Sequence, residues 1–320
     1  MSLPHRRRAR RLSALTLAGA LVLAGCGAER AEENPPASGS PEAQSFPVTL
    51  TPAEGEPVTI DARPERIVSM SASNTETLFA IGAGDQVVAV DEQSTYPADA
   101  PRTDLSGLTP NVEAIVEFDP DLVILSDDVD DIAASLTRLD RAVLTVPAAQ
   151  TLDDVYAGME LLGKATGHAD EATDLADRTR TDLDKIVADT PKPSEPLTYY
   201  HELDTSYYSA TSKTFIGQVY GLFGLENIAD PADKDAGGYP QLSVEHILAA
   251  DPDLIFLADV ECCGQTAETV AARPGWSALS AVENGNVVEL DDDLASRWGP
   301  RVVDLAESVA DAVTKAGEQS

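Results

Sequence analysis

The residue types that most often catalyse reactions or bind metals are few in this chain and widely spaced. Beyond the N-terminal segment the histidines are His168, His201 and His246, whose spacing does not indicate a zinc-type cluster. The sequence also lacks a Gly-x-Ser-x-Gly motif, a phosphate-binding glycine-rich loop with lysine, and a Gly-x-Gly-x-x-Gly after a strand-like run. We therefore expect no resident metal, no permanently bound cofactor and no enzymatic activity.

The first cysteine ends a segment that is typical of exported proteins. An arginine-rich start leads into the apolar residues 12–23, which are too few to span a bilayer, and then into Leu23-Ala24-Gly25-Cys26. This ending resembles the lipobox of bacterial lipoproteins. The resemblance implies that residues 1–25 are a signal peptide and that Cys26 carries a diacylglycerol anchor. An ordinary secretory signal with a chance cysteine is the alternative, and the route of export, Sec or twin-arginine, stays open.

The two remaining cysteines, Cys262 and Cys263, are adjacent. In an oxidising compartment outside the cytoplasm, adjacent thiols can form a disulfide. We expect a vicinal disulfide that stiffens the surrounding loop, with two free thiols or a metal contact as the alternatives.

The composition disfavours partners that carry many negative charges. The chain of 320 residues carries 22 Lys and Arg against 55 Asp and Glu, a net charge of −33, and such a surface repels nucleic acid and anionic lipid headgroups. Residues 26–45 are rich in Pro, Ser, Glu and Ala, which predicts a disordered tether. We expect an extracytoplasmic monomer on the outer face of the cytoplasmic membrane, held there by its lipid.

Two stretches of the chain are near-copies of each other. Residues 111–128 read NVEAIVEFDPDLVILSDD, and residues 243–260 read SVEHILAADPDLIFLADV. Each opens on a good helix N-cap, Asn111 or Ser243, is interrupted by Asp-Pro-Asp, and closes on a short apolar run that suits a parallel strand buried on both faces. Only two copies exist, which indicates two similar α/β lobes and not a solenoid.

The rest of the pattern fits this division. Strand-like runs are expected at 66–70, 87–90 and 143–146, and again at 197–201 and 287–290, with helical patterns between them. Residues 151–189 have helical spacing, interrupted near Gly167-His168. We predict an α/β fold of two Rossmann-like lobes with parallel sheets, 46–165 and 193–320, joined by one long helix within 166–192.

Several motifs together resemble those of a known family. They are Arg63-Pro64-Glu65-Arg66-Ile67-Val68 ahead of Ser73-Asn74-Thr75-Glu76, the two repeats, and Trp298-Gly299-Pro300-Arg301. From about Phe46 onward the chain resembles the substrate-binding proteins of iron-chelate and cobalamin ABC importers. The resemblance implies a ligand cleft between the two lobes, and delivery of the ligand to a permease dimer with its ATPase subunits.

Ligands of parallel α/β sheets bind beyond the carboxyl ends of the strands, and the loops expected there are rich in tyrosine. Amphipathic rings suit a bulky, partly apolar ligand, although each of these aromatics could equally be a packed loop residue. His201, beside Glu202, could contact ligand or even a haem iron, or belong to a hydrogen-bonded rim. The candidate ligand-binding residues are Tyr96, His201, Tyr207, Tyr208, Tyr239, Arg297 and Trp298.

Arg297 bears on the identity of the ligand. In so acidic a chain, an arginine at the cleft is a candidate to contact an anionic chelate such as a ferric siderophore, with a surface ion pair as the alternative. Cobalamin is less favoured because Gly107-Leu108-Thr109-Pro110 stands where the cobalamin-binding branch has a cleft tryptophan. We expect a ferric chelate as the transported ligand, with cobalamin or haem as alternatives. A secreted two-lobed enzyme is the rival class.

Glu113 and Glu245 occupy the same place in the two repeats, two residues after the N-cap. A carboxylate in a helix's first turn is stabilised by the helix dipole, and this alone could explain both residues. In the resembled family, glutamates at these positions pair with arginines on the two permease subunits. We expect Glu113 and Glu245 to dock the protein on its permease.

Overall fold

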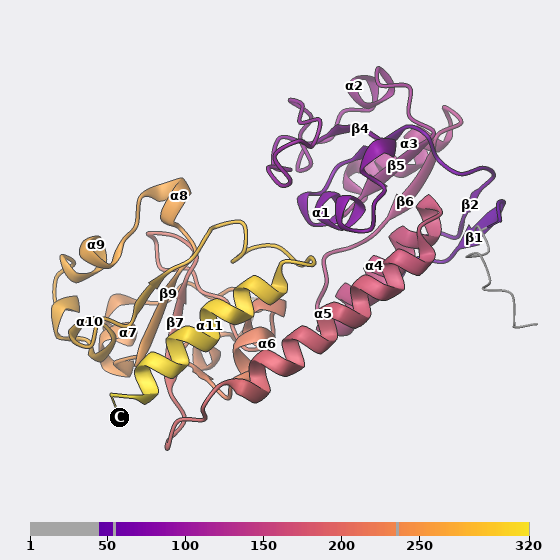
Figure 1. Ribbon diagram of the computed structural model, residues 1–320. Helices are drawn as coiled ribbons and strands as arrows, with labels where there is room; N and C mark the ends of the chain where they lie inside the picture. Colours follow the sequence, from indigo (N-terminus) through magenta and orange to yellow (C-terminus); the bar gives the residue numbers. More distant parts are fainter. Residues whose placement is uncertain (1–44, 54–55, 235–236, 320) are drawn as a thin grey trace, which may run out of the picture. The chain divides into compact units, whose positions relative to one another are not determined.

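The computed structural model describes residues 45–53, 56–234 and 237–319 (Figure 1). The expected signal peptide, Cys26 and all but the last residue of the expected tether lie outside these ranges. No helix in the described part of the chain is long and apolar enough to cross a membrane.

The first lobe is built on a four-stranded parallel sheet (Figure 1). Its strands β3 and β5 are buried along their whole length, which explains why the chain is apolar without alternation there. A separate antiparallel pair precedes the sheet. The strands are β1 (Val48–Leu50), β2 (Val58–Ile60), β3 (Ile67–Ser69), β4 (Val87–Val90), β5 (Leu122–Leu125) and β6 (Ala142–Thr145), and the helices are α1 (Ala72–Ala80), α2 (Val112–Val116) and α3 (Ile132–Thr137), with 3₁₀ turns η1 (Gly84–Gln86) and η2 (Val129–Asp131).

The second lobe is built on another four-stranded parallel sheet. Its strands are β7 (Thr198–Glu202), β8 (Glu226–Asn227), β9 (Leu254–Leu257) and β10 (Val287–Glu289). The helices are α6 (Phe215–Leu222), α7 (Val244–Ala250), α8 (Val260–Cys263), α9 (Ala267–Ala271), α10 (Ser280–Glu283) and α11 (Val302–Gly317), with 3₁₀ turns η3 (Asp230–Ala232) and η4 (Trp276–Ala278).

The two lobes share one topology. The sheet orders are β4-β3-β5-β6 and β10-β9-β7-β8, so in each lobe the first and third strands along the chain are the central neighbours. The two sequence repeats supply α2 with β5 and α7 with β9, which is the same helix and third strand in each lobe. The predicted α/β fold of two similar lobes is confirmed.

The Asp-Pro-Asp turns explain why the repeats are alike. The first aspartate of each turn, Asp119 or Asp251, has a left-handed backbone, with φ of 47° and 45°. The second aspartate binds the chain just where the first strand of its lobe begins. The Asp121 carboxylate accepts from the backbone N–H groups of Glu65 and Arg66 at 2.8 and 3.0 Å. The Asp253 carboxylate accepts from the N–H and hydroxyl of Thr198. Each repeat therefore fixes its own strand against its central neighbour.

Two helices connect the sheets, α4 (Leu152–Thr166) and α5 (Ala169–Asp189), and the chain passes to the second lobe through α5 (Figure 1). They are separated at Gly167, whose φ of 79° ends α4, as the sequence pattern indicates. Both helices contribute to both cores: α4 places Met159 with the second lobe and Leu162 with the first. The connection is therefore a packed pair of helices and not an isolated rod.

Candidate ligand-binding site

A cavity of about 310 Å³ lies at the carboxyl ends of the first-lobe strands and is closed on one side by the loop that follows β10. This is where a parallel α/β sheet is expected to bind ligand. Its lining comes from both lobes: Met70, Ser71, Ala72, Ser73, Asp91, Gln93, Gly107, Leu108, Ser126, Asp293, Ser296, Arg297 and Trp298.

The lining combines polar side chains with the apolar residues Met70, Ala72, Leu108 and Trp298. Ser71, Ser73 and Ser126 offer hydroxyl groups, and Leu108 is 79% exposed. The Asp91 carboxylate accepts a hydrogen bond from the Ser94 hydroxyl, while its burial raises its pKa above the ordinary value. A Cβ on Gly107 would lie 2.6 Å from the Asp91 carboxylate, so this site requires glycine.

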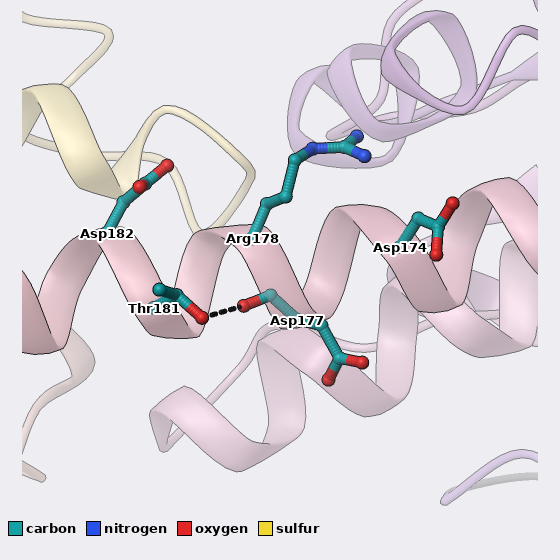
Figure 2. Close-up of a pocket in the computed structure, with 5 residues that line it drawn as sticks. All are labelled: Asp174, Asp177, Arg178, Thr181 and Asp182. Atoms are coloured by element: carbon teal, nitrogen blue, oxygen red, sulfur yellow. Dashed lines mark hydrogen bonds between the residues drawn. The ribbon is translucent and has the colours of Figure 1, made fainter.

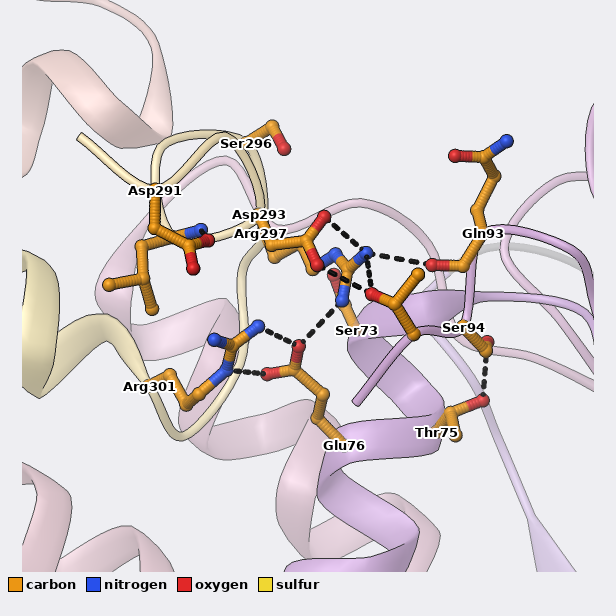
Figure 3. Close-up of polar contacts among 12 residues, drawn as sticks. Ser73, Thr75, Glu76, Gln93, Ser94, Asp291, Asp293, Ser296, Arg297 and Arg301 are labelled. Carbon is orange, nitrogen blue, oxygen red and sulfur yellow. Dashed lines mark hydrogen bonds and ion pairs between the residues drawn. The ribbon is translucent and has the colours of Figure 1, made fainter. Parts of the chain in front are cut away.

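Arg297 lies in this cavity, but its N–H groups are already bonded (Figure 3). One guanidinium nitrogen donates to the Glu76 carboxylate at 2.9 Å. The other donates to the Gln93 carbonyl, the Thr95 hydroxyl and the Asp293 carboxylate, at 2.7, 3.0 and 2.5 Å. Three of these four acceptors belong to the first lobe, so Arg297 joins the lobes and its charge is balanced by two carboxylates.

Glu76 is the centre of these contacts (Figure 3). Its side chain is 1% exposed, and both carboxylate oxygens also accept from Arg301, at 2.6 and 3.0 Å. The Arg301 guanidinium lies 4.4 Å from the centre of the Tyr96 ring, a cation–π contact. In the sequence, Glu76 stands out only as part of a family motif. Its burial and its partners cannot be read from the neighbouring residues, because the partners lie more than 200 positions away.

Trp298 lines the cavity, whereas Tyr96 is not part of its lining and packs against Arg301. The Trp298 backbone N–H donates to the Ser73 hydroxyl at 3.2 Å, which pins the loop on the start of α1. Its indole N–H is buried and has no partner among the described residues.

His201 is placed differently from the expectation that it lies on the cleft rim. The ring is fully buried, bonded through Nδ1 to the Tyr220 hydroxyl at 2.8 Å, and burial lowers its pKa to about 4. The reason is that β7 continues through Glu202, one residue further than predicted, which places His201 inside the sheet.

The tyrosines of the second lobe do not line the cavity. Tyr207 stacks on Trp276 at 5.8 Å and belongs to the packing of that lobe. Tyr208 and Tyr239 are exposed and lie in neighbouring loops, which are joined by a bridge between Tyr208 and Gln241.

A second cluster of buried polar side chains lies at the carboxyl ends of β7 and β9. Arg273 donates to both carboxylate oxygens of Glu202 at 2.5 and 2.6 Å. Asp259 is fully buried, and neither of its carboxylate oxygens has a hydrogen-bond donor in the described part of the chain. Burial and the nearby Glu202 raise the pKa of Asp259 to about 7. In the sequence, Asp259 directly follows the apolar residues 254–258 of the second repeat, and no local pattern marks it as a site residue.

The structure joins Cys262 and Cys263 in a vicinal disulfide within α8. The backbone N–H groups of Val260 and Cys262 both donate to the Asp292 carboxylate at 2.8 Å, which ties α8 to the loop after β10. The described residues contain no group of three or more His, Cys, Asp or Glu side chains able to hold a metal ion.

Glu113 and Glu245 are exposed near the starts of α2 and α7. The N-caps bond in the same way: the Asn111 side chain accepts from Ala114 N–H, and the Ser243 hydroxyl accepts from His246 N–H. Neither glutamate side chain has an ion-pair partner in the described ranges. Each lobe thus presents one unpaired carboxylate from the same place in its repeat.

A further hollow of about 290 Å³ lies along α5 (Figure 2). Asp174, Asp177, Arg178, Thr181 and Asp182 line it, and all five come from one exposed face of this helix. With no second element contributing to it, this hollow is the solvated surface of a charged helix.

Comparison with known proteins places the chain in a family. Residues 67–294 match the family model described as periplasmic binding protein. The chain is 33% identical over 317 residues to an uncharacterized ABC transporter substrate-binding lipoprotein of Bacillus subtilis, covering 96% of this chain and 98% of that protein. It is 34% identical over 281 residues to a cobalamin-binding protein of Halobacterium salinarum, covering 84% and 74% of the two chains.

Among solved structures, a possible iron-binding, periplasmic solute-binding protein of Staphylococcus epidermidis is similar, with a TM-score of 0.68 and 26% identity over 79% of this chain and 99% of that one. The two similar lobes with a cavity between them agree with these matches. The chain belongs to the periplasmic binding protein family and is a substrate-binding protein of an ABC importer.

Proposed function

We propose that this protein binds cobalamin, or a closely related corrinoid, and delivers it to an ABC permease. The observation that carries the choice of ligand is the pairing of Arg297 with Glu76 and Asp293. Because the charge of this arginine is balanced, the cavity offers hydroxyl and carboxylate groups without an excess positive charge. Cobalamin suits such a lining since its corrin ring carries amide groups, which can donate to these oxygens.

A corrinoid is larger than the cavity and would reach the surface around it. At about 310 Å³ the cavity accommodates only part of a corrinoid, so the remainder would extend over the rims. Leu108 and Tyr96 are exposed on the first lobe, and Tyr208 and Tyr239 on the second. These side chains suit the apolar faces of a large ring. The 34% identity with a cobalamin-binding protein supports the same choice.

A ferric siderophore is the second candidate. It is favoured by the similarity to a possible iron-binding protein and by the presence of Arg297 in the cavity. Haem would require an iron ligand from the protein, and the burial of His201 leaves the exposed tyrosines of the second lobe for that role.

Titration with cyanocobalamin tests the proposal. Trp298 lines the cavity, whereas Trp276 is fully buried in the second lobe, and these are the two tryptophans of the chain. We expect saturable quenching of the fluorescence with a stoichiometry of one, and a much smaller signal in Trp298→Phe. Isothermal calorimetry checks that this variant still binds. Binding of ferrichrome together with no binding of cyanocobalamin would make the protein a siderophore carrier instead.

We also propose how the protein reaches and engages its importer. A diacylglycerol on Cys26 would hold the protein on the outer face of the membrane, and residues 27–45 would give it reach. Glu113 and Glu245, one on each lobe, would pair with arginines of the two permease subunits. Their exposure and their lack of ion-pair partners within the described residues support this role.

A further inference from the structure

Positive charge is scarce in the second lobe, where residues 193–320 contain three lysines and three arginines. After residue 193 the chain has three arginines, Arg273, Arg297 and Arg301, and the chain as a whole carries a net charge of −33. Arg273 is bonded within its own lobe to Glu202. Arg297 and Arg301 instead reach across to the first lobe, and both bind one carboxylate, that of Glu76 (Figure 3).

Glu76 differs from the other acidic partner of these arginines. Asp293 is 35% exposed, lies four residues before Arg297 and pairs with that arginine alone. The Glu76 carboxylate is 1% exposed, comes from α1 of the first lobe, and accepts from three guanidinium nitrogens at 2.6 to 3.0 Å. In a site shielded from water, such a charge acts strongly on its surroundings.

We propose that Glu76 is a specificity-determining residue of the cleft. Its carboxylate holds Arg297 and Arg301 in one ion-paired joint between the lobes, and it thereby removes the positive charge that would draw anionic chelates into the cavity. This inference rests on the proposed ligand-binding role of the cleft, but it does not depend on which neutral ligand the cleft accepts.

The charges within the joint give a direct test. Glu76, Asp293, Arg297 and Arg301 sum to zero charge, which Glu76→Gln raises to one positive charge. The double variant Glu76→Gln with Arg301→Gln returns the sum to zero while still lacking the Glu76 carboxylate. Ferric citrate serves as the anionic probe and cyanocobalamin as the neutral probe, and calorimetry measures both affinities at low salt and at about 0.5 M NaCl.

We expect Glu76→Gln to bind ferric citrate at least about tenfold more tightly than the wild type at low salt, with most of the gain lost at high salt. The double variant should return to the wild-type affinity. An equal gain in the double variant would show that a loosened joint and not charge admits the anion, and would overturn the proposal. A folded Glu76→Gln with unchanged affinity for ferric citrate would overturn it as well.

Circular dichroism and thermal unfolding establish that each variant is folded. If Glu76→Gln does not fold, Asp293→Asn removes the other, partly exposed partner of Arg297 and raises the charge by the same amount. We then expect a smaller gain in ferric citrate affinity, and no gain would contradict the proposal. Failure of the wild type to bind cyanocobalamin counts against the proposed function alone, because the ferric citrate comparison does not use that ligand.

Discussion

At the scale of single residues, Asp259 and His201 are both buried in the second lobe, and pH affects them in opposite ways. Burial lowers the pKa of His201 from 6.5 to about 4, so this residue removes stability as the pH falls from 6.5 towards 4. Burial raises the pKa of Asp259 from 3.8 to about 7, so the folded state binds the extra proton. Stability is therefore lost as the pH rises from 3.8 through 7. Between pH 4 and 6.5, the effects of His201 and Asp259 on the free energy of unfolding partly cancel.

The variant Asp259→Asn should separate the pH effect of Asp259 on stability from that of His201. The asparagine amide can donate to Glu202, which replaces the carboxyl proton without a charge. At pH 8, where the wild-type carboxyl is mostly ionised, we expect the free energy of unfolding to rise by about 1.5–3 kcal/mol, the usual strength of a hydrogen bond to a charged group. Between pH 4 and 6.5 the stability of this variant should climb more steeply than that of the wild type, because the His201 effect is no longer opposed.

Urea unfolding across this pH range measures both effects. Asp177→Asn, on the exposed face of α5, is the matched control and should leave the pH profile unchanged. If Asp259→Asn and the wild type have parallel profiles, Asp259 does not titrate near neutral pH.

Single residues of the two lobes differ in how far the sequence alone reveals their place in the site. Arg297 and Trp298 could be singled out because Trp298 opens the motif Trp298-Gly299-Pro300-Arg301 and Arg297 directly precedes it. His201 was expected on the rim because the end of β7 was placed one residue too early. Glu76 and Asp259 were missed because a buried charge is defined by its partners, and those partners are distant in the sequence.

At the scale of elements, the repeats were predictable because an apolar run after Asp-Pro-Asp has few alternatives to a buried strand. The start of α1 was less certain. Residues 71–74 offer several good helix caps, and the helix begins at Ala72 after an extended Ser71. Ser73 and Asn74 instead use their side chains for contacts with Trp298 and with the Val146 carbonyl. The two-residue strand β8 is too short to leave a pattern.

Two glycines of α6 should respond oppositely to alanine. A Cβ on Gly217 would lie 1.9 Å from the Thr211 carbonyl oxygen and 2.7 Å from Ser212 Cα, whereas a Cβ on the exposed Gly221 meets nothing within 4 Å. We expect Gly217→Ala to lower the free energy of unfolding by about 1–3 kcal/mol, because the 211–212 loop must move. Gly221→Ala should raise it by up to about 1 kcal/mol through helix propensity. Chemical unfolding measures both, and equal effects would contradict the close packing of α6 on this loop.

At the scale of the whole molecule, the proposed docking on the permease requires both lobes at once. We expect the double variant Glu113→Ala with Glu245→Ala to keep the ligand affinity of the wild type, because neither residue lines the cavity. The same variant should fail to stimulate the ATPase of the cognate importer in proteoliposomes, because two charge-assisted contacts are lost.

The matched control changes Glu117 and Glu283, exposed acids on the same two lobes, to alanine. It should behave as the wild type. Normal stimulation by the Glu113 and Glu245 variant would leave the helix dipole as the sufficient reason for these two glutamates.

The presence of two lobes could be inferred from two copies of one motif, but the contact between the lobes could not. Arg297 and Glu76 are 221 residues apart, and their pairing depends on how two separately formed sheets come together. Patterns among neighbouring residues carry no information about a contact between residues so far apart in the sequence.

The single crossing of the chain through α5 has a consequence for the order of assembly. All strands of the first sheet lie within residues 67–145, and all strands of the second within 198–289. As the chain emerges from its N-terminus, the first sheet is complete before any strand of the second exists, and each sheet forms from neighbouring segments. Glu76 is among the early residues, whereas Arg297 and Arg301 follow the last strand. The contact that joins the two lobes thus becomes available only after the strands of both sheets, and among the described helices only α11 follows it in the chain.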